Sequence, residues 1–405
     1  MVKLNSQNKG KLQLKRQSGN SSQSKTKTVD SSRQTPSSEI KEALQDQFGD
    51  RIAHIDNLLA FCSQNNCSDL YITIGKKPFI NRYGFMYEVP CYKTTQSVWN
   101  VWADIAINSE QNKTYIRNKM YDMSYSINVK SDMLDRWIPT NKDLDKATNL
   151  RYRVSVGFSL GAKNAVFRMI SPELPSFNKL NFNHGVYKTI LETTRQRNGI
   201  VILAGPTGSG KTTTMAAAIN DFTQPLGTMA NSTIISLEDP VEYVYDNRVN
   251  VNIIQKELGK DFRTFELGIK QSLREHPTFI IVGESRDRET ISSLVEASRT
   301  GHMVFTSFHA SSVADTISRI YNHLVIDNPE VMYDLISQMD MILCQRIKAN
   351  GAMFVLETQY MVFTDEIIRT INKEIFEGKN INVIIDDLFS REDLINSGIL
   401  KDWSE

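Results

Sequence analysis

One stretch of the sequence has the spacing of a phosphate-binding loop. Residues 205–212 read Gly-Pro-Thr-Gly-Ser-Gly-Lys-Thr and match the pattern G-x-x-x-x-G-K-[ST] at every fixed position. The stretch follows an apolar segment at 199–204 and precedes helix-forming residues at 215–219. In such a loop the glycines let backbone N–H groups close around phosphates, and the following helix adds its positive dipole end. We therefore predict that Lys211 neutralises phosphate oxygens and that the Thr212 hydroxyl ligates Mg²⁺.

The predicted nucleotide contacts include the whole loop and the residue after it. They are Gly205, Pro206, Thr207, Gly208, Ser209, Gly210, Lys211, Thr212 and Thr213. This loop alone does not distinguish a kinase, a GTPase or a motor. The base-reading motif N-K-x-D of a GTPase is missing from the sequence, so ATP with Mg²⁺ is the expected pair.

Two acidic clusters follow the loop, each after a short apolar segment. Glu238-Asp239-Pro240-Val241-Glu242 follows residues 233–237, and Glu284-Ser285-Arg286-Asp287 follows residues 279–282 and a glycine. Ligands of parallel sheets bind beside the carboxyl ends of strands, so the first cluster is expected to approach the γ-phosphate. In most ATPases with this loop, an aspartate at the end of such a strand holds magnesium. Here Glu284 stands in its place, and the alternative interpretation of the second cluster, taken on its own, is a solvated turn.

Two histidines, His302 and His309, stand at the two ends of the apolar segment 303–308. A single histidine is usually a structural residue with satisfied hydrogen bonds. A pair that flanks one strand of a nucleotide-binding domain could instead sense phosphate or relay a contact between subunits. We favour the second interpretation and assign neither histidine the role of general base.

The arrangement of apolar residues divides the chain into regions with different sequence patterns. From residue 179 onward, short unbroken apolar runs alternate with helical patterns, which is typical of an α/β domain with a parallel sheet covered on both faces. Residues 49–170 combine amphipathic helices with short alternating strands, which predicts a small α+β domain. The two prolines in residues 171–176 make residues 171–178 the best candidate for a linker. We expect residues 179–365 to form the ATPase domain and residues 366–405 to form a helical tail.

Composition and charge restrict the remaining possibilities. Residues 1–40 carry eight lysines and arginines against two acids, whereas the other 365 residues have a net charge of −5. Residues 1–48 are therefore expected to be a disordered basic tail that either binds nucleic acid or anionic lipid or, as we favour, only aids solubility. Cys62, Cys67, Cys91 and Cys344 lack a paired C-x-x-C spacing, which favours reduced thiols over a zinc or disulfide site. No apolar run reaches the length of a membrane span or signal peptide, so a cytoplasmic protein is expected.

These motifs together resemble the signatures of the secretion ATPase superfamily that drives type II and type IV secretion, conjugation and type IV pili. The family carries a phosphate loop, an aspartate box (here 238–242), an atypical Walker B strand that ends in Gly-Glu (283–284) and a histidine box (302–309). All four occur here in the order of the family, over about a quarter of the chain. The resemblance implies a RecA-like ATPase domain.

The N-terminal region extends the resemblance. The segments Cys67–Ile72, Arg151–Val154 and Ala165–Arg168 are similar to three strands of the PAS-like N-terminal domain in these hexamers. In the family, arginines of that domain reach the nucleotide. Arg153 and Arg168 are the candidates here and Arg151 is a weaker one. The alternative is that they are sheet-edge arginines paired with surface acids.

The resemblance also implies the assignment of catalytic roles. Glu242 is expected to be the general base, with Glu238 and Asp239 near the nucleotide, and Glu284 is expected to face Mg²⁺ through a water. Among the branches of the superfamily, residues 241–246, 283–287 and 360–366 are most similar to the ATPases of type IVB secretion and plasmid conjugation. A hexameric ring motor that docks on an inner-membrane complex is therefore expected. The alternatives are a pilus-retraction motor, a nucleic-acid-stimulated translocase and a non-hydrolysing adaptor.

Overall fold

The structure is a computed structural model. It describes residues 38–49, 51–107, 119–129, 148–170, 173–180, 182–245, 248–324, 329–350 and 353–403. The predicted basic tail lies outside these ranges except for its last eleven residues, and so do residues 171–172 of the predicted linker. None of the helices in the described ranges has the length and apolar character that a bilayer-crossing segment needs.

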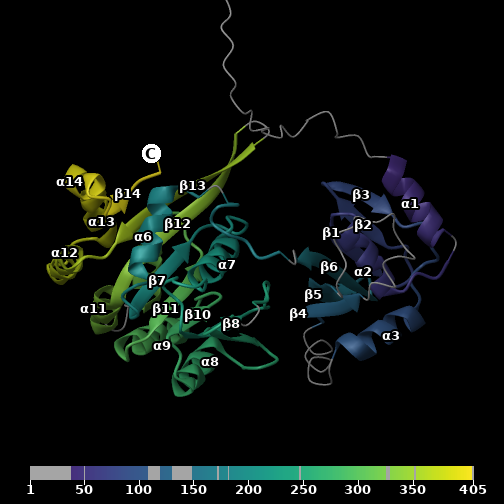
Figure 1. Ribbon diagram of the computed structural model, residues 1–405, viewed down its shortest axis with the longest axis horizontal. Helices are drawn as coiled ribbons and strands as arrows, with labels where there is room; N and C mark the ends of the chain where they lie inside the picture. The colour runs from purple at the N-terminus through teal and green to yellow at the C-terminus, as the bar shows by residue number, and fades with distance from the viewer. Residues whose placement is uncertain are drawn as a thin grey trace, which may run out of the picture. The chain divides into compact units, whose positions relative to one another are not determined.

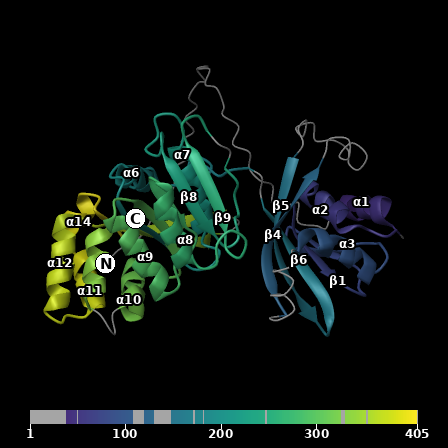
Figure 2. The ribbon, with the colours of Figure 1, turned by 90° about the horizontal axis from the view of Figure 1, so that it is seen from below.

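The N-terminal domain is a six-stranded antiparallel sheet with helices on one face. The strand order is β3-β2-β1-β6-β5-β4. The strands are β1 (Cys67–Thr73), β2 (Phe79–Arg82), β3 (Phe85–Glu88), β4 (Tyr121–Val129), β5 (Thr148–Ser159) and β6 (Ala162–Ile170). The helices are α1 (Ser38–Phe48), α2 (Ile55–Gln64) and α3 (Gln96–Ala106), and Figure 2 shows them together on one side of the sheet. The domain thus combines helices with an antiparallel sheet.

Alternation along β5 and β6 decides which residues of this domain are available for function. Tyr152 and Val154 on β5 and Phe167 on β6 are fully buried against the helices. Because side chains of a strand alternate between faces, Arg153 and Arg168 lie on the opposite face, where they are direct partners in the sheet register. All four cysteines are free and buried.

The prediction of a disordered tail over residues 1–48 is wrong at its inner end. Residues 38–48 form α1, and Ile40, Leu44 and Phe48 are buried in the core of the N-terminal domain. The Phe48 ring packs edge-on against Phe61 of α2, with 5.3 Å between the ring centroids. These apolar residues recur at every fourth position, so a single stripe of α1 closes the core.

The second domain is built on an eight-stranded mixed sheet with the order β14-β13-β12-β7-β11-β10-β8-β9. Five strands, β7 to β11, are mutually parallel, and β12 is parallel to β7, whereas β13 is antiparallel to both of its neighbours, β12 and β14. The strands are β7 (Gly199–Ala204), β8 (Thr233–Glu238), β9 (Asn252–Glu257), β10 (Phe279–Val282), β11 (Met303–Phe308), β12 (Met339–Asn350), β13 (Met353–Val362) and β14 (Leu400–Lys401). This is the predicted α/β, RecA-like architecture (Figure 1).

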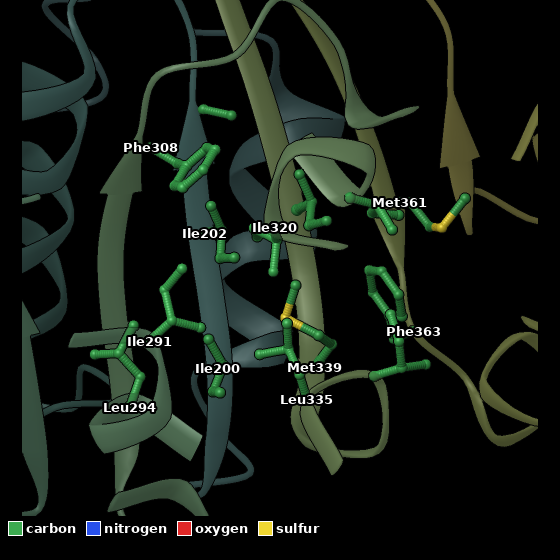
Figure 3. Close-up of a cluster of buried hydrophobic side chains, with 14 of the residues drawn as sticks. Ile200, Ile202, Ile291, Leu294, Phe308, Ile320, Leu335, Met339, Met361 and Phe363 are labelled. Atoms are coloured by element: carbon green, nitrogen blue, oxygen red, sulfur yellow. The ribbon is translucent and has the colours of Figure 1, made fainter. Parts of the chain in front are cut away.

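Helices cover both faces of this sheet, and β7 contributes alternate side chains to each of the two cores. Ile200 and Ile202 belong to one cluster, in which Figure 3 shows them beside Phe308 and Ile291, whereas Val201 and Leu203 belong to the other. The first cluster is covered by α8 (Phe265–Ser272), α9 (Arg288–Arg299), α10 (Val313–Leu324), α11 (Pro329–Gln338), α12 (Asp365–Phe376), α13 (Ile381–Phe389) and α14 (Glu392–Asn396). The second is covered by α6 (His184–Thr193) and α7 (Lys211–Phe222). Burial on both faces explains why these strands read as unbroken apolar runs.

The C-terminal region is not the separate tail that the sequence suggested. Residues 366–405 contribute helices, as predicted, but Ile367, Ile371 and Ile384 are fully buried in the core of the ATPase domain. Strand β14 pairs with β13 and extends the sheet. The ATPase domain therefore continues to residue 403, the last described residue.

Candidate nucleotide-hydrolysis site

The predicted phosphate loop connects β7 to α7 at the carboxyl end of the parallel sheet. Gly208 and Gly210 have φ values of 79° and 86°, a region that side chains rarely adopt. At Gly205 a Cβ atom would lie 2.4 Å from both the Gln345 carbonyl oxygen and Ser209 Oγ. Glycine is therefore required in the loop both for conformation and for the close approach of β12.

Lys211 is the first residue of α7 and is almost fully buried. Its ammonium group donates to the carbonyl oxygens of Gly205 and Pro206, at 2.8 and 3.1 Å. Burial lowers the pKa of Lys211, and the nearby Glu284 carboxylate opposes that shift. The Lys211 ammonium group therefore lies inside the phosphate loop, where it is bonded to the backbone of the same loop.

A pocket of about 680 Å³ opens beside this loop, within the ~300–1,000 Å³ range of small-molecule sites. Its lining combines loop residues with both acidic clusters and with arginines from the N-terminal domain. The predicted site residues that line it are Thr207, Gly208, Gly210, Lys211, Thr212, Thr213, Glu238, Asp239, Glu242, Glu284, His309, Arg153 and Arg168. The structure therefore brings most of the predicted residues to one pocket.

Glu238 is a partly buried carboxylate that accepts hydrogen bonds from three residues of the protein. Ser236 Oγ and Gln255 Nε2 donate to its Oε1, the latter at 3.1 Å, and the Glu242 backbone N–H donates to its Oε2 at 3.4 Å. Burial raises the pKa of Glu238, and these hydrogen bonds oppose the shift. Both carboxylate oxygens of Glu238 therefore already accept hydrogen bonds from neighbouring residues.

Glu242 has a more open environment. Its Oε1 lies 3.9 Å from Arg153 Nη1, beyond hydrogen-bond distance. Burial raises the pKa of Glu242, and the guanidinium groups of Arg153 and Arg168 hold it lower than burial alone would. A half-buried carboxylate with a raised pKa, whose oxygens accept no hydrogen bond from the residues that the structure describes, has the properties of a general base. Burial also raises the pKa of the neighbouring Asp239, again opposed by Arg153.

Glu284 follows β10 and contacts two side chains, the Arg286 guanidinium and the His309 imidazole. Its Oε1 is 2.9 Å from His309 Nε2 and its Oε2 is 2.5 Å from Arg286 Nη2. The pKa of His309 is lowered, first by burial and next by the charge of Lys211. The solvated-turn interpretation of this cluster is therefore wrong for Glu284. It does hold for Asp287, whose carboxylate caps α9 by accepting from Thr290 N at 2.7 Å.

Gly283 explains why this strand ends in Gly-Glu. Its N–H donates to Leu237 O at 2.7 Å, and a Cβ atom would lie 3.2 Å from that oxygen and 3.4 Å from Glu238 Cα. A side chain at 283 would push β10 away from β8. The absent side chain therefore keeps the two acidic clusters close together.

The structure does not bring His302 to the pocket. It precedes β11, at the amino end of the strand, and its Nδ1 lies 3.1 Å from Ala297 O and 3.2 Å from Thr300 Oγ1. The ring ties the end of α9 to β11. The predicted nucleotide contact of His302 is therefore wrong within a single chain, and only His309 fits that role.

Several side chains that support the site were missed from the sequence. Gln345 on β12 donates to Ser209 O at 2.7 Å and so supports the backbone of the phosphate loop. Ser307 Oγ donates to Gly283 O at 2.6 Å, and Gln255 holds the first acidic cluster. Gln345 and Gln255 belong to no motif, and Ser307 lies in the histidine box without being one of its histidines, so nothing in the local sequence marked these side chains as supports of the site.

Comparisons with known proteins decide the family. The profile of the family described as "Type II/IV secretion system protein" matches residues 111–373, which is more than half of the chain. The chain belongs to this family. Its members include secretion and pilus motors, and this protein is an ATPase of that group. The predicted resemblance to the secretion ATPase superfamily is thereby confirmed.

Individual relatives support the same conclusion. The type IV pilus retraction ATPase PilT of Pseudomonas aeruginosa is 27% identical over 322 residues, which cover 79% of this chain and 86% of PilT. The crystal structure of the ATPase DotB of Legionella pneumophila superposes with a TM-score of 0.69 at 24% identity, covering 86% of this chain and 90% of DotB. A structure of the pilus retraction motor PilT with bound ADP gives 0.65 at 24% identity, covering 84% and 94%. At these identities the two structures support the fold alone.

Proposed function

We propose that this protein is a hexameric ring motor that hydrolyses ATP to power a type IVB secretion or plasmid conjugation apparatus. The choice of system rests on the segments 241–246, 283–287 and 360–366, which resemble DotB and the conjugative transfer ATPase TraJ. The fold similarity to DotB is consistent with it. The motor would work in the cytoplasm, docked on components of an inner-membrane complex, with an N-terminal domain of PAS-like type.

The proposal of ATP hydrolysis rests on one observation. Lys211, Glu242 and Glu284 line the same pocket. In our mechanism the loop amides and Lys211 bind the phosphates, and Lys211 exchanges its carbonyl partners for phosphate oxygens. Glu242 accepts a proton from the attacking water. Arg153 and Arg168 supply positive charge from the N-terminal domain as negative charge develops on the transferred group.

The donor set fits a magnesium ion that is bound mostly through phosphates and water. Among the described residues, no cluster of three or more His, Cys, Asp or Glu side chains could hold a metal ion alone. Mg²⁺ in nucleotide sites usually has only one or two protein ligands and keeps several waters. Thr212 would hold the ion directly and Glu284 through a water, and the ion would neutralise phosphate charge.

Steady-state hydrolysis of ATP by three variants tests these roles. Lys211→Ala should lose nucleotide binding and turnover. Glu242→Gln should keep binding but lose about 100-fold or more in kcat, the usual contribution of a general base. Glu284→Gln should need more Mg²⁺ for half-maximal rate. Glu296→Gln, which changes an exposed carboxylate on α9, is the matched control. Normal turnover by Glu242→Gln would disprove our assignment of the base.

The ring is tested by measuring mass in solution. Light scattering of the full chain with saturating ATP and Mg²⁺ should give the mass of a hexamer. A monomeric mass under these conditions would rule out the ring as the working state.

A pilus-retraction motor is the second candidate, because the identity with PilT spans most of both chains. Its chemistry would be the same and its load different. Restoration of pilus retraction by this protein in a strain that lacks PilT would favour the second candidate. ATPase activity that rises with single-stranded DNA and falls steeply with salt would instead indicate a nucleic-acid translocase.

A further inference from the structure

The loop that carries Glu242 has an unusual set of hydrogen bonds. It leaves β8 at Asp239-Pro240 and passes along the edge strand β9. In the described part of this loop, the hydrogen bonds to the backbone of residues 241–245 all come from side chains. Buried backbone groups need partners, so the residues that supply them determine the path of the loop.

Gln255 of β9 supplies more of these bonds than any other described residue. Its Oε1 accepts from the Tyr245 backbone N–H at 3.0 Å, and its Nε2 donates to Tyr243 O at 2.7 Å and to Glu238 Oε1 at 3.1 Å. Both donor hydrogens and the acceptor of one amide are thus used on the residues that flank Glu242. No other neutral side chain of this size could make all three contacts.

Side chains of β9 alternate between the two faces of the sheet, and those that hold the loop all lie on one of these faces. Glu257, two residues after Gln255, accepts from the Val241 backbone N–H at 3.4 Å. Lys256, between them, points to the other face and pairs with Glu275 at 2.5 Å. Residues 241, 243 and 245 are therefore held by side chains at 257 and 255, on the same sheet face as α7.

The position of the base depends on this support. The contact of the Glu242 carboxylate that the structure shows is Arg153 at 3.9 Å, too long to fix the side chain. The backbone of the loop must then place the carboxylate. A misplacement of about 1 Å in a catalytic group can reduce the rate about 100-fold.

We propose that Gln255 is a positioning residue for hydrolysis and that its side-chain amide fixes the loop that carries Glu242. The inference rests on the proposed role of Glu242 as the base. Gln255 does not touch the reacting atoms; it acts through the backbone at 243 and 245 and through the Glu238 carboxylate.

Two variants of Gln255 and one control test this proposal in the full-length protein. Gln255→Leu keeps the approximate volume of the side chain and removes all three hydrogen bonds. Its kcat should fall ~10- to 100-fold, with KM for ATP unchanged, because the loop and not the phosphate site is disturbed. Lys256→Gln, on the opposite face of the same strand, should keep the kcat and KM of the parent protein.

Gln255→Glu gives a second readout and covers the case in which Gln255→Leu does not fold. A carboxylate at 255 keeps the acceptor for Tyr245 but loses both donors. Once protonated, it can donate one hydrogen bond again. The kcat of this variant relative to the parent should therefore rise as the pH falls. A ratio that is independent of pH would contradict the proposal, and so would a folded Gln255→Leu protein with normal kcat or with only a raised KM.

A double-mutant cycle separates this inference from the proposed function. If Gln255 acts through Glu242, adding Gln255→Leu to Glu242→Gln should cause no further loss of kcat. An undiminished further loss would overturn the inference and leave the assignment of the base intact. Normal turnover by Glu242→Gln alone would instead refute the base, whatever Gln255 does.

Discussion

At the scale of single residues, the pocket contains three glutamates that their surroundings assign to different tasks. Glu238 is saturated by donors from Ser236, Gln255 and the loop backbone, so it acts as an anchor. Glu284, which follows β10, is held by an ion pair with Arg286 and by a contact with the His309 imidazole. Glu242 alone among the three keeps oxygens without a close partner among the described side chains. In the mechanism that we propose, the same residue type would thus serve structure, charge balance and proton transfer through differences in hydrogen bonding.

The pH dependence of hydrolysis should report on Arg153. Burial raises the pKa of Glu242, and the Arg153 charge opposes that rise. A base works only when deprotonated, so activity should be lost as the pH falls through this pKa. In Arg153→Gln the pKa should rise further, and the acidic limb of the kcat profile should move to higher pH. The measurement is kcat at saturating ATP across the pH range.

The control for this change is Arg195→Gln, which removes an exposed arginine that pairs with Glu192 on α6. Its pH profile should coincide with that of the parent protein. An acidic limb that stays in place in Arg153→Gln would show that Arg153 does not influence the base.

At the scale of elements, sequence patterns predicted β7, β8, β10 and β11, because these parallel strands are buried on both faces. The edge strand β9, which is only partly buried, was not predicted. The runs at 199–204, 233–237, 279–282 and 303–308 all became strands of the central sheet. Their carboxyl ends carry the loop and the acidic clusters, so motif and fold supported each other. What escaped prediction was contact between distant segments, such as Gln345 beneath the phosphate loop or Gln255 beside residue 243. No local sequence pattern marks such residues, because the order of the strands in the sheet determines which residues they contact.

Gly283 provides a test of how tightly the two acidic strands must approach. In Gly283→Ala the new methyl group would lie 3.2 Å from Leu237 O, a backbone atom that cannot move alone. We expect a loss of about 1–3 kcal/mol in the free energy of unfolding, typical of overpacking. We also expect a decrease in kcat larger than any change in KM, because Glu284 moves relative to Glu238. Thermal unfolding and steady-state turnover measure the two effects.

A matched change is available in the N-terminal domain. A methyl group at Gly157 of β5 would come closest to Asn164 Oδ1, at 3.3 Å, and this flexible side chain can move away. Gly157→Ala should therefore unfold and turn over nearly as the parent does. If Gly283→Ala did the same, close approach of β8 and β10 would not be required for catalysis.

At the scale of the whole molecule, both boundary errors have one physical origin. Composition averaged over residues 1–48 hides the stripe of Ile40, Leu44 and Phe48, because three apolar residues are few among many polar ones. Similarly, the two-residue strand β14 is too short to be recognised, yet it joins the C-terminal helices to the sheet. Segments that look peripheral in sequence are parts of the two cores. Whether such a segment is buried depends on the surface that the rest of its domain presents to it, and the segment's own sequence does not show that surface.

Removing α1 should therefore destabilise the N-terminal domain. Leu44 is 1% exposed, and Leu44→Ala should cost about 2–5 kcal/mol in the free energy of unfolding. Glu42→Ala, which changes an exposed residue of the same helix, should cost little. In thermal unfolding, a chain that begins at Ser37 should melt with the full chain, since it keeps the whole of α1. A chain that begins at Gly49 should melt markedly lower. Equal melting of all three chains would mean that the N-terminal core is complete without α1.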